Sequence, residues 1–381
     1  MGNLGTLLCN RQRQPPNIGE LGKRRTKFWL ARYGYSLFFL GVLAAGIQTA
    51  KAEDIRFPRF SPDGKSLIFD RCNPSYPERC RIHVYSLETG ALGYYKPPSG
   101  QTWLQAHYAD TGDQLVFVSM PVGERARSIL SQRENVLLNT QIAVMNLDGS
   151  NMQIVTDTIG YKGMPAFSHS GKKVIFAQAE KLRDSGETIA EFWDLQELHL
   201  DTGAVTLFAG RSFGFYQMGM STYFKGDNSV LLNADAPMDQ DGPLQLPTGD
   251  YGGHSNNSQI YVLVRDKTTL EAPLFGKYAS ANDAHMDSEG NIFFLGTGDS
   301  DGTTIRSDRR NNQHLSWPSP PFGESGGSFV GSAISQDGRY FAMSVVYGDY
   351  ADKNIKLMLL DIASGAWREI ELPPQTYQIN N

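Results

Sequence analysis

One ten-residue phrase, repeated along the chain, constrains the fold more than any other feature. Its best copy, Phe60 to Phe69, reads Phe-Ser-Pro-Asp-Gly-Lys-Ser-Leu-Ile-Phe. An apolar residue ends one expected strand, the chain turns at Asp63-Gly64, and an apolar run begins the next strand. Glycine accepts a positive φ and aspartate tolerates left-handed geometry, so the phrase predicts a tight hairpin.

Six unequal copies of this phrase can be aligned on their turn residues. The anchors are Gly64, Gly112, Gly171, Asp227, Gly290 and Gly338. They are separated by 48, 59, 56, 63 and 48 residues. A self-similar period of this size is typical of solenoids, propellers and arrays.

A second phrase, a strand that ends in a glycine turn, follows most of the hairpins. Its copies are Ile82–Gly90, Ile142–Gly149, Leu198–Gly203 and Leu357–Gly365. A further short strand follows each copy, so every repeat is expected to hold four antiparallel strands and no long helix. The sequence therefore predicts an all-β fold, a six-bladed β-propeller over residues 53–381. The expected blades cover about 55–100, 101–160, 161–212, 213–278, 279–322 and 323–375.

These repeats resemble those of the TolB-like propeller family, whose blades have WD-repeat-like Ser-Pro-Asp-Gly turns. Phe60 to Phe69 and Phe167 to Phe176 match that pattern well, while repeats four and five match it poorly. TolB itself also has an α/β domain before its first blade, whereas here Ile55 leads almost directly into the first repeat. The resemblance implies an exported propeller of the cell envelope that holds another protein or a polymer.

Residues 1–52 have the pattern of a secretory signal peptide. A basic stretch, Lys23 to Lys27, precedes an apolar core from Tyr35 to Ile47, and Ala50-Lys51-Ala52 fits a cleavage site with small residues. We expect cleavage after Ala52, with no membrane span left, and a protein that is periplasmic or secreted. An uncleaved membrane anchor is the alternative, although the apolar run is short for a span of about 20 residues.

The charge of the remaining chain argues against some partners. Residues 1–52 hold eight of the 35 basic residues and one of the 40 acidic residues, which leaves a net charge of −12 for residues 53–381. So acidic a protein is a poor candidate for binding nucleic acid or anionic membranes. We expect a monomer whose partner is an envelope protein or a polysaccharide.

Cys72 and Cys80 flank one expected hairpin loop, eight residues apart. In an oxidising compartment this arrangement predicts a disulfide bond. Two free buried thiols are the alternative, and a metal site would need further ligands nearby.

The longest loop, Ala234 to Ser258, concentrates acidic residues. It carries Asp235, Asp239, Asp241, Asp250 and His254. Loops of this length are often functional, and carboxylates can hold Ca²⁺. The spacing matches no EF-hand loop, so a solvated loop is the alternative. No cofactor is expected, and the sequence leaves open whether any metal binds.

Two histidines occupy equivalent places in two repeats. His107 and His285 each lie five residues before the turn glycine, and Arg59 takes this place in repeat one. The first strand of a propeller blade is the innermost, so Arg59, His107 and His285 form a candidate channel site. Packing between blades is the alternative role for both histidines.

No sequence signature of a nucleophilic hydrolase, a zinc protease or a phosphate-binding loop is present. The leading hypothesis is therefore a non-enzymatic binding module of the bacterial cell envelope. The alternative is a propeller lyase or hydrolase that acts on envelope or extracellular polysaccharide; a sensor ectodomain is a third idea. Ring closure is open, since either Glu53–Arg56 or Gln375–Ile379 can add to an end blade.

Overall fold

The structure is a computed structural model of the 381-residue chain. The chain divides into two compact units, Met1–Val42 and Leu43–Asn381, and the described residues all belong to the second unit. They cover 54–379 except 74–75, 77–78, 123–138, 185–187, 216–217, 225, 236–237, 240–241, 244–257, 268–269, 271–273, 276–279, 299–301, 309–313, 321–326, 348–353 and 375. Within these residues, no helix has the length and apolar character needed to cross a bilayer.

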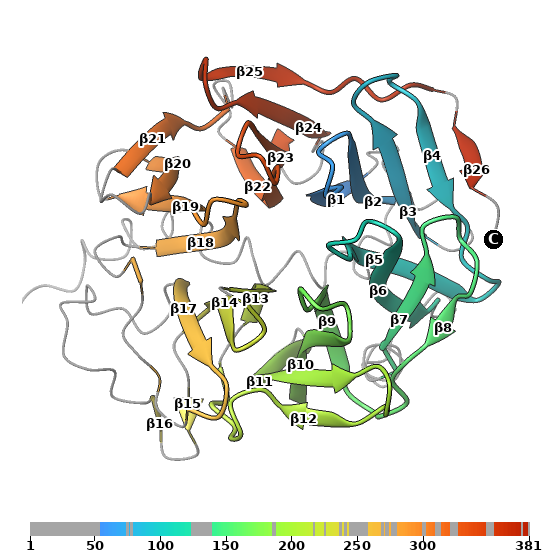
Figure 1. Cartoon of the computed structure of the whole chain (residues 1–381), viewed down its shortest axis with the longest axis vertical. Coiled ribbons are helices and arrows are strands. Elements are labelled where there is room, and N and C mark those ends of the chain that lie inside the picture. Colours follow the sequence, from blue (N-terminus) through green and yellow to red (C-terminus); the bar gives the residue numbers. More distant parts are fainter. Residues whose placement is uncertain are drawn as a thin grey trace, which may run out of the picture. The chain divides into compact units, whose positions relative to one another are not determined.

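Strands make up the regular structure of the described residues, and consecutive strands pair to form separate sheets (Figure 1). The first sheet contains β1 (Asp54–Phe60), β2 (Ser66–Cys72), β3 (Cys80–Ser86) and β4 (Leu92–Tyr95). The second contains β5 (Gln101–Tyr108), β6 (Gln114–Pro121), β7 (Gln141–Asn146) and β8 (Gln153–Ile154). The third contains β9 (Tyr161–Phe167), β10 (Lys173–Asp184), β11 (Thr188–His199) and β12 (Val205–Leu207).

The last three repeats form sheets in the same way, with one incomplete case. Repeat four gives a three-stranded sheet of β13 (Met218–Tyr223), β14 (Ser229–Ala234) and β17 (Gln259–Val264), with the pair β15 (Met238–Asp239) and β16 (Gly242–Pro243) apart from it. Repeat five gives β18 (Ser280–Met286), β19 (Ile292–Gly298), β20 (Gly302–Asp308) and β21 (His314–Pro318). Repeat six gives β22 (Gly327–Ile334), β23 (Tyr340–Tyr347), β24 (Asn354–Asp361) and β25 (Ala366–Glu369).

The fold is thus the predicted all-β propeller of four-stranded antiparallel blades. The number of complete blades differs from the prediction. Five sheets have four strands from one repeat, whereas the sheet of repeat four has three among the described residues. A long connection separates β14 from β17 in that repeat.

The first strands of successive sheets surround a common axis. β1, β5, β9, β13, β18 and β22 lie next to one another in this order, and β22 lies next to β1 (Figure 1). The ring therefore closes through direct contact between the first and the last sheet. This arrangement brings the predicted site residues of β1, β5 and β18 toward the centre of the propeller.

The repeated phrase forms the tight turns that its residues predict. In the first copy the amide of Gly64 donates to the carbonyl of Ser61 at 2.9 Å, and the Ser61 hydroxyl donates to Asp63 at 2.6 Å. Gly64 has a φ of 70°. Left-handed backbone is costly for residues with a Cβ, so glycine is favoured at this place.

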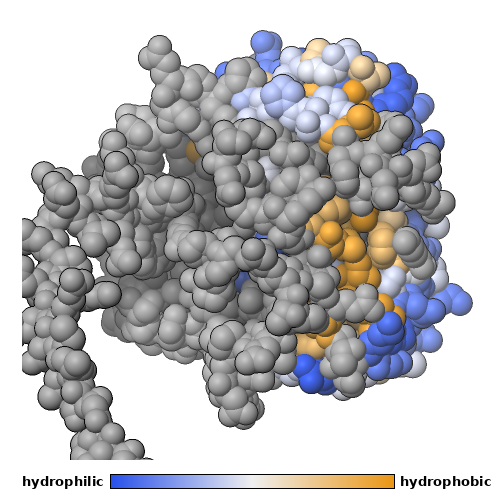
Figure 2. All heavy atoms as spheres, turned by 90° about the vertical axis from the view of Figure 1, so that its left-hand side faces the viewer, coloured by the Kyte–Doolittle hydropathy of each residue, from blue (hydrophilic) through white to orange (hydrophobic). Residues whose placement is uncertain are grey.

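Apolar side chains fill the space between neighbouring blades. The cluster between the first two blades joins Ile68, Ile82 and Tyr95 to Trp103, Leu115 and Phe117. Comparable clusters join blades two and three, four and five, and five and six. In Figure 2 the described residues are seen on the right-hand side, where a hydrophobic patch is bordered by hydrophilic residues along the outer margin. Burial of apolar side chains contributes about 1.5–3 kcal/mol each.

The carboxyl-terminal strand settles the question of closure. β26 (Tyr377–Ile379) pairs with β4 on the outer edge of the first sheet (Figure 1). The first blade is complete without it, because β1 to β4 come from one continuous segment. Of the two segments that the sequence offered, the tail adds to a blade other than its own, the first blade. The amino-terminal segment belongs to β1 and forms part of the first blade, which directly follows it in the sequence.

Candidate functional site on the innermost strands

Every innermost strand is irregular at the same position. The register with the second strand shifts between Arg56 and Arg59, and at the matching places in β5, β9, β13, β18 and β22. The first extra residue has a positive φ in four of these bulges: Phe57 (50°), Gln105 (56°), Met164 (54°) and Asp283 (53°). Such backbone costs roughly 1–3 kcal/mol per residue for non-glycine side chains, so other contacts must hold it.

Side chains of the preceding blade bind the amides of three bulges. The amide of Gln105 donates to both carboxylate oxygens of Asp70, at 2.8 and 2.9 Å. The amide of Met164 donates to Oε1 of Gln105 at 2.7 Å, and the amide of Asp283 to Oδ1 of Asn233 at 3.2 Å. These bonds join neighbouring blades near the axis and stabilise the strained backbone.

The residue that follows each bulge defines a set that we call the inner ring. Its members are Arg59, His107, Ala166, Ser221, His285 and Ser332. The three predicted channel residues therefore occupy equivalent positions on β1, β5 and β18. Their role as a binding or catalytic site stays a prediction.

Arg59 links the first blade to the last blade and interacts with buried carboxyl groups. Its side chain is buried, and Nη1 donates to the carbonyls of Pro58 at 2.6 Å and Ser332 at 2.5 Å. Nη2 is buried without a hydrogen-bond partner among the described residues. Burial lowers the pKa of Arg59 to about 10, while the carboxylates of Asp283 and Asp70 act in the opposite direction. Arg59 thus remains a cation at neutral pH. Burial raises the pKa of Asp70 to about 7, although the amide of Gln105 and the charges of Arg56 and Arg59 oppose this effect.

Asp283 links His285 to the last blade. Nε2 of His285 lies 3.4 Å from Oδ1 of Asp283, and the Ser332 hydroxyl donates to Oδ2 of Asp283 at 2.7 Å. Burial lowers the pKa of His285, and Asp283 opposes this effect. Burial also raises the pKa of Asp283, but His285, Arg59 and Ser332 together bring it below its ordinary value. The carboxylate is therefore ionised, and its Oδ2 is hydrogen-bonded to Ser332. Oδ1 of Asp283 and Nε2 of His285 are buried without a hydrogen-bond partner among the described residues.

His107 is neutral at physiological pH. Burial lowers its pKa to about 4, and the positive charge of Arg59 acts in the same direction. Nδ1 donates to the carbonyl of Tyr108 at 2.7 Å, which leaves Nε2 as the nitrogen with a lone pair. His285 makes a smaller contribution in the same direction, so the pKa of His107 depends on both of the other predicted channel residues.

Within the described residues, no three histidine, cysteine or acidic side chains lie close enough together to hold a metal ion. His107, His285 and Asp283 thus do not form a ready coordination sphere. A catalytic zinc, for comparison, is usually held by three protein ligands.

The acidic loop of repeat four is described only in part. Asp235 is buried, and burial raises its pKa to about 7 although Ser258 hydrogen-bonds its side chain. The backbone of Asp239 belongs to β15. The other predicted loop ligands, Asp241, Asp250 and His254, lie outside the described residues, so the Ca²⁺ hypothesis stays a prediction.

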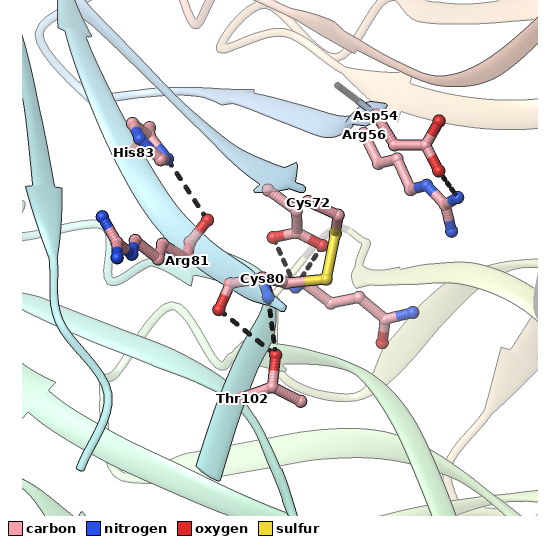
Figure 3. The surroundings of a disulfide bond; sticks show 9 residues. Asp54, Arg56, Cys72, Cys80, Arg81, His83 and Thr102 are labelled. Atoms are coloured by element: carbon pink, nitrogen blue, oxygen red, sulfur yellow. Dashed lines mark hydrogen bonds and ion pairs between the residues drawn. A yellow bond between two sulfur atoms is a disulfide. The ribbon is translucent and has the colours of Figure 1, made fainter. Parts of the chain in front are cut away.

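The predicted disulfide bond is present. Cys72 ends β2 and Cys80 begins β3, and the two residues are directly opposite in the antiparallel register (Figure 3). The hydroxyl of Thr102, from the second blade, accepts from the Cys80 amide at 3.1 Å and donates to the Cys80 carbonyl at 3.2 Å. The bridge thus fixes the end of a hairpin that also contacts the neighbouring blade.

Sequence reasoning missed four polar residues of the inner strands and their neighbours: Asp70, Gln105, Asn233 and Asp283. Each is buried and takes part in a bond to another blade. One signal was available, because charged or amide side chains rarely occur in buried strand interiors without a partner. Asp70 follows Leu67-Ile68-Phe69, an otherwise apolar run.

Solved structures similar to this chain are propellers. TolB from Acinetobacter baumannii matches with a TM-score of 0.53 and 12% identity over 92% of this chain and 70% of its own. A tricorn protease matches with 0.53 and 12% identity over 85% of this chain, which spans only 27% of that protein. An oligogalacturonate lyase in complex with manganese matches with 0.50 and 14% identity over 83% of this chain and 77% of its own.

No protein-family model and no curated protein sequence matches the chain. At 12–14% identity, the structural matches establish the fold and leave the activity open. The chain is a β-propeller whose structural neighbours include TolB.

Proposed function

We propose that this chain is an exported, non-enzymatic binding module of the bacterial cell envelope that holds a protein or a polysaccharide through the loops of its propeller. One observation carries the proposal: the polar groups nearest the axis serve to join blades. Nη1 of Arg59 bonds to Ser332, Asp283 bonds to Ser332 and faces His285, and Asp70 bonds to Gln105. Such a rigid ring suits a scaffold whose loops select the partner.

Export is supported by two independent features. Residues 1–52 carry the pattern of a signal peptide, and the disulfide between Cys72 and Cys80 suits an oxidising compartment. We propose a periplasmic or secreted monomer, cleaved after Ala52. Intact-mass measurement of the exported protein decides this, since an unprocessed amino terminus contradicts it.

The alternative, a lyase or hydrolase on acidic polysaccharide, is favoured by a different observation. His107 and His285 occupy equivalent inner-ring positions, and Arg59 in the same ring has an Nη2 atom without a hydrogen-bond partner among the described residues. The oligogalacturonate lyase in complex with manganese has a similar fold. An enzyme of this kind needs a neutral imidazole that accepts a proton. The imidazole of His107 is neutral, and its Nε2 carries the lone pair that would accept the proton.

Affinity purification from the native envelope, with metal analysis of the same sample, separates the two functions. For a binding module, His107→Gln and His285→Gln leave the captured partner and the metal content unchanged. His199→Gln is the matched control, because His199 lies outside the inner ring at the end of β11. Two results contradict the proposal. One is stoichiometric metal in the wild type that both inner-ring variants lose, and the other is cleavage of an acidic polysaccharide that both variants abolish.

A further inference from the structure

The carboxyl-terminal strand β26 pairs in parallel with the outer edge of β4. Among the described strand pairs, β26 and β4 form the parallel one. Tyr377 faces Gly93, Gln378 faces Tyr94, and Ile379 faces Tyr95. The preceding strand of this region, β25, belongs to the last blade. The tail therefore crosses from the last blade to the first and binds there as an added strand.

Two side chains anchor this strand on one face of the sheet. The aromatic ring of Tyr377 lies over Gly93 so closely that a Cβ built on Gly93 would be 2.8 Å from Cζ and 2.9 Å from Cε2 of that ring. Ile379 packs against the apolar cluster between the first and second blades. Residues i and i+2 of a strand point to the same side, so both anchors meet the sheet together.

The glycine at position 93 makes room for the aromatic anchor. Its backbone lies outside the left-handed region, so the strand conformation does not itself require glycine. The three atoms nearest to an added Cβ all belong to Tyr377. Gly93 is thus a notch in the edge strand that an aromatic ring fills.

The tail is held by few contacts. β26 has three residues, and Tyr377 remains 55% exposed although it occupies the notch. The first blade already has its four strands without β26. Local opening of such a short outer strand requires little free energy, because it disrupts few buried contacts.

We propose that the edge of β4 is a peptide-binding site that the chain's own tail occupies, and that an extended segment of a partner protein displaces the tail. The segment fits if it runs parallel to β4 and carries an aromatic residue followed, two positions later, by a branched aliphatic residue. Main-chain hydrogen bonds supply affinity in this mode of recognition, and pockets for alternate side chains supply specificity. This site lies at the outer end of the blade, away from the inner ring, and does not rest on the proposed function.

The tail acts as an intramolecular competitor for this site. A tethered segment has a high effective concentration, often in the millimolar range, so it lowers the apparent affinity of a peptide added in solution. The double variant Tyr377→Ala/Ile379→Ala removes both anchors and leaves β1 to β4 unchanged. It therefore opens the edge without altering the blade.

The test uses the isotope-labelled protein and an unlabelled peptide with the sequence of residues 372–381. Backbone amide signals of Gly93, Tyr94 and Tyr95 report binding. We expect the peptide to shift these signals in the double variant at a concentration at least about tenfold lower than in the wild type. A control peptide with alanine at both anchors shifts nothing.

Gly93→Ala in the double variant closes the notch, because its Cβ takes the place of the aromatic ring. Alanine is compatible with the strand, so the blade remains folded and the amide signals of β1 to β3 keep their positions. We expect peptide binding to be lost. The proposal is overturned if the folded double variant does not bind the peptide, or if the control peptide or the Gly93→Ala protein gives the same shifts.

Discussion

Nη1 of Arg59, near the end of the first strand, donates a hydrogen bond of 2.5 Å to the carbonyl of Ser332, which lies 273 residues later in the last blade. This single side chain thus joins the two ends of the ring. It also compensates the charge of the buried carboxylate of Asp283, and it interacts with the buried carboxyl group of Asp70, whose pKa is raised by burial to about 7. Ring closure and charge balance therefore depend on the same guanidinium.

Arg59→Met is expected to lower the free energy of unfolding by about 3 kcal/mol, because it removes the hydrogen bond to Ser332 and leaves the buried carboxylate of Asp283 without this positive charge. Urea unfolding measures this loss. Arg339→Met is the control, since Arg339 is an exposed arginine of the last blade, and its effect is expected to stay within about 0.5 kcal/mol. Equal effects of the two substitutions contradict the role of Arg59.

Glu197 forms a second link between blades. Its carboxylate is buried and accepts bonds from Nη1 and Nη2 of Arg265, at 2.6 and 2.5 Å, and from the Tyr223 hydroxyl at 2.7 Å. Glu197→Gln is expected to cost about 3 kcal/mol, because the partly buried guanidinium of Arg265 loses the counter-ion to which it is hydrogen-bonded. Glu369→Gln, which breaks the surface pair with Lys356, is the control and is expected to cost less than about 1 kcal/mol.

The Glu197 link also has a defined pH dependence. Burial raises the pKa of this carboxyl group, but the bonds from Arg265 and Tyr223 lower it below its ordinary value. Its stabilisation is thus complete above the ordinary pKa of about 4.3 and is lost as the pH falls through the lower folded-state value. The difference in stability between wild type and Glu197→Gln should therefore shrink on acidification. A difference that does not change with pH argues against an ionised Glu197.

His169 gives the opposite pH dependence. Its Nδ1 lies 2.7 Å from Oδ2 of Asp110 in the neighbouring blade, and this hydrogen bond raises the pKa of His169. The stabilisation is fully present below the ordinary pKa of about 6.5 and is lost as the pH rises through the folded-state value. Both side chains are partly exposed, so the effect is below about 1 kcal/mol.

His169→Gln is therefore expected to destabilise the protein at pH 5 and to have a smaller effect at pH 9. Urea unfolding of both proteins at the two pH values measures this. A larger loss at pH 9 than at pH 5 contradicts the assignment.

The disulfide is expected to stabilise the fold by about 2 kcal/mol, because it closes a loop of eight residues. The double variant Cys72→Ser/Cys80→Ser should show this loss in thermal or urea unfolding. Reduction of the wild type is the matched control and should lower stability by a similar amount. Unchanged stability after both treatments contradicts the expected contribution of the bridge.

The sequence allowed correct predictions of those features that depend on residues close together along the chain. Asp63-Gly64 and its copies predicted the hairpins, because the turn requires a left-handed residue at a fixed place. The same spacing aligned His107 with His285, and the register of the strands agrees with that alignment. Cys72 and Cys80 were paired correctly because the hairpin placed them opposite each other.

What could not be predicted depends on contacts between blades. The positive φ of Gln105 and Asp283 has no local signature, since it is maintained by Asp70 and Asn233 of other blades. The parallel docking of Tyr377 on Gly93 likewise depends on a notch nearly 300 residues away along the chain. In repeat four, three strands form the sheet among the described residues, where the sequence predicted four.

Each four-stranded blade of this propeller is built from one continuous segment, and the tail adds only an outer strand. In propellers whose last blade combines strands from both ends of the chain, any insertion or loss of a repeat must preserve that shared blade. Here, the boundaries between blades coincide with the boundaries between consecutive segments of the chain. A segment that holds one blade can therefore be inserted or removed without dividing another blade between two distant parts of the chain.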